Sequence, residues 1–183
     1  MRVQHDLPGL DLSLFALDGE RQMATDESIV FHNNPALPGS GVTGRFSQYE
    51  AQFSIDLAWL GNVERLMSTA SHDEWPLKRA GRLRAEVAGL AFEPLSALQS
   101  EKAAMLLEFY RYRGEWRVAA VGQGFAGGLA ELIALFGSEV AQPPHLRPHL
   151  PLPVPSPYPP PQRPPVSVLP TSVWSKWSAS TSH

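Results

Sequence analysis

Residues 114–137, GEWRVAAVGQGFAGGLAELIALFG, form the stretch that decides the fold. Its glycines Gly122, Gly124 and Gly127 have the G-x-G-x-x-G spacing that holds a dinucleotide pyrophosphate between a strand and a helix. That motif needs a second parallel strand and an acidic ribose ligand about 20 residues further on. The chain instead becomes rich in proline from Pro143 onward, which is incompatible with a buried parallel strand. The sequence therefore disfavours a nucleotide-binding oxidoreductase.

Alternating apolar and polar residues predict β-strands in the preceding part of the chain. Residues 53–59, FSIDLAW, and residues 10–14, LDLSL, place their apolar side chains on one face of a strand. Several such strands separated by turn residues predict an antiparallel β-sandwich. We expect the aromatic side chains of Trp59, Phe109 and Trp116 to lie in its core.

The β-rich runs 104–112 and 116–121 predict a hairpin, joined through the three residues 113–115. Residues 79–90 fit either a strand or a helix. A short terminal helix is predicted by an apolar stripe at helical spacing, formed by Leu129, Leu132, Ile133 and Phe136. The glycine-rich loop before this helix either permits a sharp turn or offers N–H groups to an anion, and we favour the structural role.

The stretch 114–137 also resembles the closing signature of the TerD family, bacterial stress-response proteins named for tellurite resistance. Residues 9–17, GLDLSLFAL, resemble the family's opening strand, and residues 26–34, DESIVFHNN, are similar to its acidic turn and the strand that follows. Residues 53–57 resemble the next strand. The resemblance implies the TerD fold, calcium-linked assembly with sibling proteins near the inner membrane surface, and resistance to tellurite, phage or chemical insult.

In the family, an acidic, glycine-rich loop binds calcium. Residues 39–51, GSGVTGRFSQYEA, correspond to that loop and match it at Thr43 and Gly44. Uncharged residues stand where the family has acids, at Ser40, Ser47 and Ala51. Arg45 adds a positive charge, and only Glu50 keeps a carboxylate. Because calcium takes six to eight oxygen ligands, several of them carboxylates, we expect no tight calcium binding.

A residual, weak calcium site could combine Asp26 or Glu27 with an amide oxygen of Asn33 or Asn34 and with Glu50. The alternative gives these residues structural roles. In it, Asp26 caps a turn, the two asparagines adopt left-handed backbone, and Glu50 ends a strand in solvent.

Catalytic constellations are poorly supported. His32, His72 and the acids after His72 could act as acid and base groups or as metal ligands, yet contiguous Ser71, His72 and Asp73 do not face one another as a triad must. We therefore expect that the protein is not an enzyme and has no certain cofactor.

Composition limits the partners. The chain has no cysteine, and residues 1–140 hold 18 acidic and 12 basic residues, a formal charge of −6. This charge disfavours nucleic acid as a partner. The absence of thiols permits a reducing compartment, and neither a secretory signal nor a transmembrane run is visible. We expect a cytoplasmic protein whose partners are other proteins, including siblings of its family, with peripheral membrane association as a further option.

The chain is predicted to divide into a TerD-like β-sandwich domain, residues 1–142, and a disordered proline-rich tail, residues 143–183. In the tail, Trp174 and Trp177 could anchor to a partner protein, or the segment could be an inert end. Membrane anchoring is less favoured because Lys176 alone is basic nearby. We thus expect a non-catalytic binding or assembly component, and alternatively a metal-independent scaffold that recruits partners through its tail.

Overall fold

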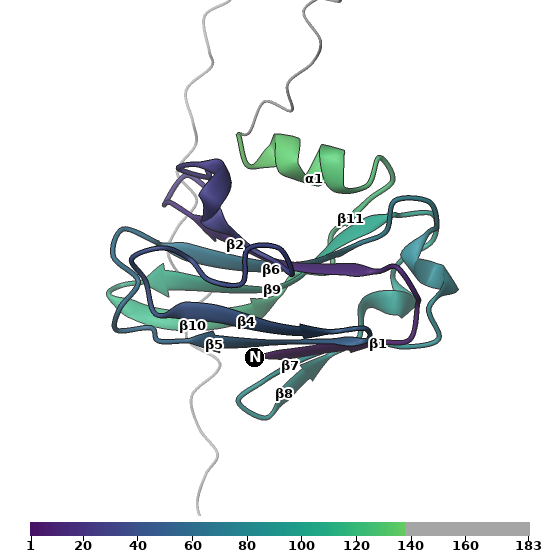
Figure 1. Ribbon diagram of the computed structural model, residues 1–183, viewed down its shortest axis with the longest axis horizontal. Helices are drawn as coiled ribbons and strands as arrows, with labels where there is room; N and C mark the ends of the chain where they lie inside the picture. The colour runs from purple at the N-terminus through teal and green to yellow at the C-terminus, as the bar shows by residue number, and fades with distance from the viewer. Residues whose placement is uncertain (138–183) are drawn as a thin grey trace, which may run out of the picture. The chain divides into compact units, whose positions relative to one another are not determined.

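The computed structural model describes residues 1–137, except for the side chain of Asp26. Two antiparallel sheets face each other, and one helix, α1, lies on the outer face of one of them (Figure 1). The five-stranded sheet has the order β4-β5-β1-β7-β8 and the six-stranded sheet the order β10-β9-β6-β2-β3, with β11 paired to β9. The predicted antiparallel sandwich with a short terminal helix is confirmed.

The strands of the five-stranded sheet are β1 (Arg2–His5), β4 (Val42–Ser47), β5 (Glu50–Ile55), β7 (Leu83–Val87) and β8 (Leu90–Phe92). The strands of the six-stranded sheet are β2 (Asp11–Leu17), β3 (Ile29–Val30), β6 (Arg65–Ser71), β9 (Ala103–Tyr112), β10 (Glu115–Ala120) and β11 (Gly124–Phe125). The helical elements are η1 (Asp26–Ser28), η2 (Leu77–Arg79), η3 (Pro94–Ser96) and α1 (Leu129–Leu135).

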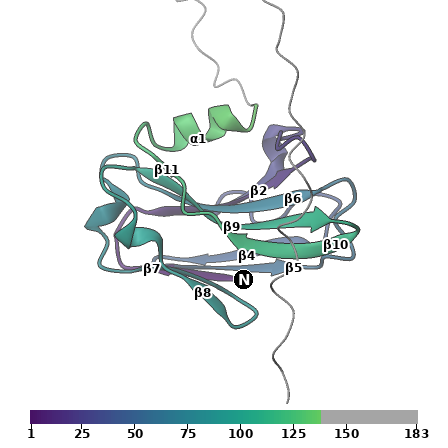
Figure 2. The ribbon, with the colours of Figure 1, turned by 180° about the vertical axis from the view of Figure 1, so that it is seen from behind.

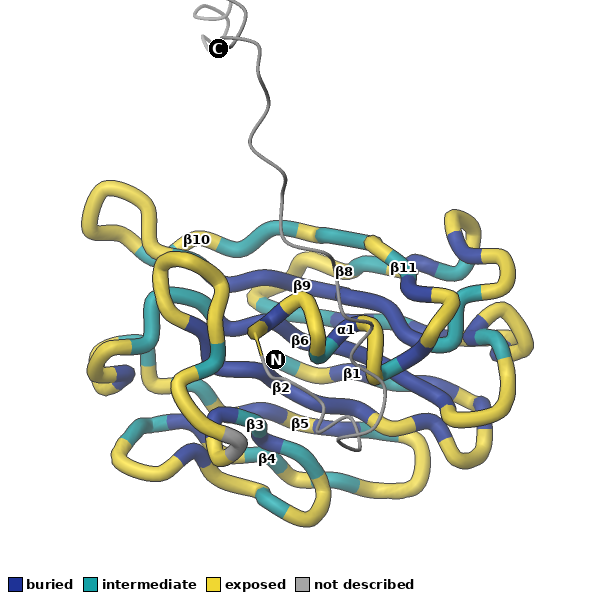
Figure 3. The backbone as a smooth tube through the Cα atoms, turned by 90° about the horizontal axis from the view of Figure 1, so that it is seen from above, coloured by how far each residue is buried: buried dark blue, intermediate teal, exposed yellow. Residues whose placement is uncertain are grey.

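The central strands β2, β6 and β9 of the six-stranded sheet are buried along most of their length, as the dark blue parts of the tube in Figure 3 show. Along β2, Leu14 faces the core between the sheets, while Phe15 belongs to a second cluster on the outer face. There α1 covers it: Leu132 and Phe136 are fully buried, and the rings of Phe15 and Phe136 lie 5.2 Å apart between centroids. Figure 2 gives the same arrangement from behind. The helix therefore has the apolar stripe that its sequence predicts.

The β9–β10 hairpin is confirmed, but its predicted three-residue connection is wrong. The turn holds two residues, Arg113 and Gly114, and Glu115 already belongs to β10. Both turn residues have positive φ, 54° and 82°, which is the conformation of a type I′ turn. The ambiguity over residues 79–90 resolves as η2 followed by the strand β7.

The core prediction is confirmed for Phe109, which is buried, whereas Trp116 is half-buried. It is wrong for Trp59, which is 63% exposed. Strand β5 ends at Ile55, and the carboxylate of Asp56 accepts a hydrogen bond from the amide of Ala58 in a turn. Because the chain turns there, the period-two pattern no longer directs Trp59 toward the core.

One carboxylate is buried in the six-stranded sheet with two arginines. Glu108 of β9 is 5% exposed, and its two oxygens lie 2.8 Å from Arg65 Nη1 and 3.1 Å from Arg21 Nη2. Arg65 begins β6 and Arg21 lies in the loop after β2. A buried charge that is paired and hydrogen-bonded in this way fixes the positions of the elements that supply it, even where it adds little net stability.

The glycine-rich loop before α1 has the structural role that we favoured. Gly122 and Gly128 have φ values of 71° and 73°, which L-residues rarely adopt. At the start of the helix, the amide of Gly127 donates to the carboxylate of Glu131 at 2.8 Å. The helix thus supplies its own oxygen to a backbone N–H that an anion would otherwise use.

Gly124 should be among the least replaceable of these glycines. A Cβ at this position would lie 2.9 Å from Leu98 Cδ2 and would overlap the side chain of Glu101, and Leu98 is fully buried. We expect Gly124→Ala to lower the free energy of unfolding by about 1–3 kcal/mol, the usual effect of overpacking. Chemical denaturation of the full chain measures this.

The matched control is Gly19→Ala, because a Cβ at Gly19 meets nothing within 4 Å. Its unfolding free energy should stay within about 0.5 kcal/mol of the wild type. Equal stability of the two variants would contradict a packing role for Gly124.

Candidate functional site

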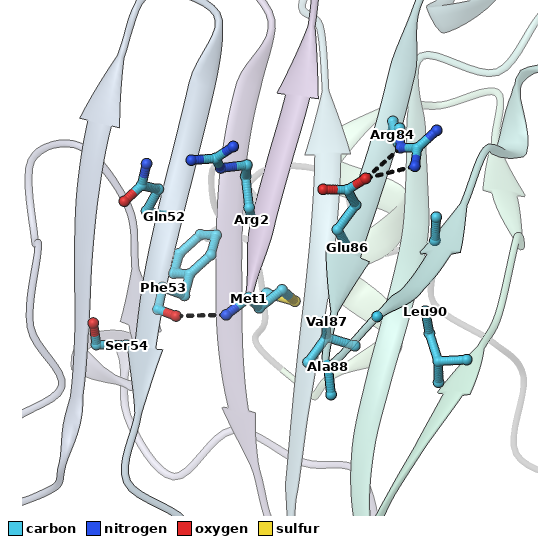
Figure 4. Close-up of a pocket in the computed structure, with 12 residues that line it drawn as sticks. Met1, Arg2, Gln52, Phe53, Ser54, Arg84, Glu86, Val87, Ala88 and Leu90 are labelled. Atoms are coloured by element: carbon cyan, nitrogen blue, oxygen red, sulfur yellow. Dashed lines mark hydrogen bonds and ion pairs between the residues drawn. The ribbon is translucent and has the colours of Figure 1, made fainter.

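The outer face of the five-stranded sheet is uncovered by any other described element and carries an open groove of about 510 Å³ (Figure 4). Its floor comes from β1 and β5, with Arg2, Gln52 and Ser54. The β7–β8 hairpin also lines the groove, with Glu86 in the same row as Arg2 and with Leu90, which pairs with the core-facing Val87, at the turn end of the hairpin. We take this groove as the candidate functional site.

The register of the sheet brings the groove's polar side chains together. Arg2 lies opposite Gln52 on one side and opposite Glu86 on the other, so these three residues form a row across β5, β1 and β7. Two positions along, Gln4 lies between Glu50 and Arg84 in the same manner. Because side chains alternate along a strand, both rows project from the same face.

The charges of this face are paired with one another. Hydrogen bonds from Gln52 and from Gln4, with the nearby charge of Arg2, lower the pKa of Glu50 below its ordinary range. Arg2 Nε lies 3.5 Å from the Glu50 carboxylate. Hydrogen bonds to Glu86 and Glu93 raise the pKa of Arg84. Both shifts favour the charged forms of Glu50 and Arg84.

An exposed apolar residue stands at the rim of the groove. The turn of the β7–β8 hairpin, Ala88 and Gly89, has positive φ at both residues, and Leu90 directly after it is 60% exposed. A groove with polar donors and acceptors on its floor and one apolar side chain at its rim can hold a protein segment that offers complementary hydrogen bonds and one apolar contact.

The residues predicted as metal ligands do not line a common hollow in the structure. Glu50 lines a hollow of about 210 Å³ with His32 and Asp11, whereas Glu27 lines another of about 340 Å³. Asn33 is exposed in a turn and lines neither of them. The side chain of Asp26 lies outside what the structure describes.

The structure also tests the structural roles that we expected for Asn33 and Asn34 in the turn at residues 31–34. The left-handed backbone expected at Asn33 and Asn34 is wrong, since the non-glycine residues with positive φ in the described chain are Arg21, Ala88 and Arg113. Asn34 instead uses its amide nitrogen to donate to the carbonyl of Ile29 at 2.7 Å. A side-chain bond thus holds this turn without left-handed backbone.

Residues 39–51 do not fit a calcium cage. The Ser40 hydroxyl donates to the carbonyl of Leu37 and accepts from the amide of Val42. Glu50 already accepts bonds from Gln4 and Gln52, as described above. Within residues 1–137, leaving aside the Asp26 side chain, no three His, Asp or Glu side chains converge as metal ligands would. The donor set therefore falls short of the oxygens that calcium needs.

His72 is fully engaged by the backbone. Its Nδ1 accepts from the amides of Glu74 and Trp75, each at 3.0 Å, so Nε2 carries the proton and donates to the carbonyl of Pro8 at 3.2 Å. The ring also stacks on Trp75, 5.2 Å away and nearly parallel. A histidine held in this way caps a turn and has no free nitrogen for proton transfer.

The groove residues Arg2, Gln52, Glu86 and Leu90 were not anticipated from the sequence. The sequence did contain one indication of them. Gln52 and Ser54 flank the apolar Phe53, so the alternating pattern places these two polar side chains on the face of β5 that points away from the core. Trp174 and Trp177, predicted to bind a partner, lie outside the described residues.

Burial of His5 should make stability depend on pH. The side chain is 6% exposed, and desolvation lowers its pKa below the ordinary value, although a hydrogen bond to the carbonyl of Leu7 and nearby acids oppose this. The unfolded chain therefore binds a proton near pH 6.5 that the folded chain still excludes. We expect the free energy of unfolding to fall as the pH drops from 7.5 through 6.5 toward 5.5, as measured by urea titration.

His5→Asn supplies a side-chain N–H for the Leu7 carbonyl without a titrating ring. Its stability should depend less on pH over this interval. An unchanged slope in the variant would assign the pH dependence to other groups.

The donor set predicts weak calcium binding at most. We expect isothermal titration of the full chain to give no dissociation constant below about 10 μM, because sites that lack most of their carboxylates fall toward the millimolar end of the range. The matched variant Glu50→Gln should leave the titration unchanged. A tight constant that this variant abolishes would contradict the prediction.

Comparison with known proteins identifies the family. The model of the TerD domain matches residues 3–136. The uncharacterized protein YceE of Bacillus subtilis (strain 168) is 30% identical over 156 residues, covering 74% of this chain and 81% of YceE. The tellurium resistance protein TerD of Serratia marcescens is 27% identical, covering 70% and 77% of the two chains. General stress protein 16U of Bacillus subtilis (strain 168) is 26% identical, covering 74% and 80%.

The fold is also found in a solved structure. The crystal structure of SAV2460, a protein of unknown function, superposes with a TM-score of 0.58 at 16% identity, covering 75% of this chain and 96% of that one. No helix within residues 1–137 is long and apolar enough to cross a membrane. On the match of residues 3–136 to the domain model, this chain belongs to the TerD family.

Proposed function

We propose that this chain is a non-catalytic stress-resistance protein that acts by binding another protein in the groove of its five-stranded sheet. Two relatives support the stress role by their names, a tellurium resistance protein and a general stress protein. The alignments with this chain cover 77% and 80% of these two relatives, so the similarity extends over most of each of them.

The observation that carries the binding role is the groove itself. Its floor offers the guanidinium of Arg2, which is 49% exposed, beside the amide of Gln52 and the hydroxyl of Ser54. Leu90 supplies an exposed apolar side chain at the rim. Protein interfaces combine an apolar anchor with a hydrogen-bonding surround in this way.

A non-catalytic role is supported by the state of the titratable groups. Glu86 in the groove is paired with Arg84, Glu50 on the same face of the sheet accepts hydrogen bonds from two glutamines, and His72 is used to cap a turn. Neither arrangement pairs a nucleophile with an oriented base.

We further propose that the protein works without tightly bound calcium, since residues 39–51 lack the family's acids. Its partner would be another protein, including a sibling of the family, and not a nucleic acid, in the cytoplasm. The second candidate is a scaffold that recruits partners through Trp174 and Trp177. The apolar character of this pair in an otherwise proline-rich segment favours it.

The double variant Arg2→Glu/Leu90→Asp tests the groove. In a host strain that lacks the wild-type gene, it should fail to restore survival of tellurite or general stress, because it reverses the groove's charge and removes its apolar anchor. Arg2 is 49% exposed at its side chain and Leu90 is 60% exposed, so the variant should still fold, and circular dichroism of the purified protein checks this.

Ala130→Glu, at an exposed position on α1, is the matched control and should restore survival. Full protection by the groove variant, together with loss of protection in Trp174→Ser/Trp177→Ser, would replace the proposal by the scaffold alternative. If all three variants restored survival, neither the groove nor the pair Trp174 and Trp177 would be needed for stress resistance.

A further inference from the structure

Three of the four sheet edges are short or covered. Strand β3 has two residues and β8 has three. Strand β4 is covered along its first half, where the amide of Gly44 donates to Pro35 and the amide of Leu37 donates to the carbonyl of Val42. Short or covered edges are the means by which sandwich proteins avoid pairing with other chains.

The fourth edge, β10, is open over six residues and lies along one border of the described molecule (Figure 3). The hairpin register decides which backbone groups face outward. Tyr112 and Glu115 flank the two-residue turn and bond to each other, so the next residues of β10 that bond to β9 are Arg117 and Ala119. The N–H and C=O groups of Trp116, Val118 and Ala120 therefore point to the free side, where no described residue pairs with them.

The usual protections against edge pairing are missing from β10. Its sequence, EWRVAA, contains no proline and no lysine, and its register with β9 runs without a bulge. The two charged residues have opposite signs and lie two positions apart on one face, Glu115 at 76% and Arg117 at 48% side-chain exposure.

This spacing of charges fits an antiparallel pairing of β10 with itself. If Trp116 lies on the two-fold axis, its free N–H and C=O bond to those of the same residue in the other copy. Glu115 then lies opposite Arg117 of the second copy, and Arg117 opposite Glu115, which gives two favourable cross-strand pairs. A register with Arg117 on the axis would oppose like charges, and one with Val118 on the axis would leave all four charges without opposite partners.

We propose that a second copy of this chain adds to the β10 edge, forming a two-fold dimer with Trp116 at its axis. The half-buried Trp116 side chains of the two copies lie on one face of the joined sheet and add apolar contact. Because the pairing uses both open edges, it closes at two copies and does not propagate into a fibre. The interface is distinct from the groove of the proposed function, so it stands or falls by itself.

Sedimentation equilibrium of the full chain tests the dimer. The wild-type average mass should rise with concentration toward twice that of one chain. Val118→Pro should keep the chain monomeric, because proline removes an N–H that faces the second copy while the bonds to β9 come from Arg117 and Ala119. Val118→Ala, which keeps the N–H, should still dimerise.

A charge exchange tests the register without touching the backbone. Arg117→Glu or Glu115→Arg alone should weaken dimerisation about tenfold, since each opposes like charges at two places. The double variant Glu115→Arg/Arg117→Glu restores opposite pairs and should dimerise like the wild type. Equal weakening in the double variant would overturn the Trp116 register.

Hydrogen exchange distinguishes a second copy at the β10 edge from another segment of the same chain at that edge. The amides of Trp116 and Val118 should gain protection only at concentrations where the dimer forms. A wild-type chain that stays monomeric at every concentration would overturn the proposal. Protection of these amides in that monomer would then assign the edge to another segment of the same chain.

Discussion

The burial of the central strands of the six-stranded sheet on both faces is the constraint on which the rest of the structure depends. Its central strands β2, β6 and β9 carry apolar side chains toward the five-stranded sheet and also toward α1. Without the helix, Phe15, Met67 and Met105 would form an exposed apolar patch. The seven residues of α1 therefore complete a second, smaller core, and Glu108 with its two arginines fills the polar part of the same face.

As a result, the outer faces of the two sheets differ. The outer face of the six-stranded sheet is occupied by the chain's own helix, whereas no described element covers that of the five-stranded sheet. The alternation of β1 and β5 follows this division, since each strand has one apolar face in the core and one polar face in the groove. The proposed binding surface therefore lies on the sheet whose outer face the described fold leaves uncovered.

Local patterns allowed much of the fold to be predicted from the sequence. Period-two runs, the β9–β10 hairpin and the apolar stripe of α1 each depend on residues close in the chain. Trp59 was misjudged because the alternating pattern continues past Ile55 although the strand does not. The groove could not be predicted, because Arg2, Gln52 and Glu86 meet only through the order of β5, β1 and β7. Edge exposure likewise follows from sheet order and not from any local motif.

The docking of α1 also has a consequence for how the protein forms in the cell. The carbonyl of Phe136, the last residue of that second core, accepts a hydrogen bond from the amide of Met23, more than a hundred positions earlier. A ribosome therefore releases the strands before it releases the helix that shields them. During this interval the nascent chain presents Phe15 and Met67 to the surrounding solution, where chaperones recognise such surfaces. Synthesis of the final turn ends this vulnerable period.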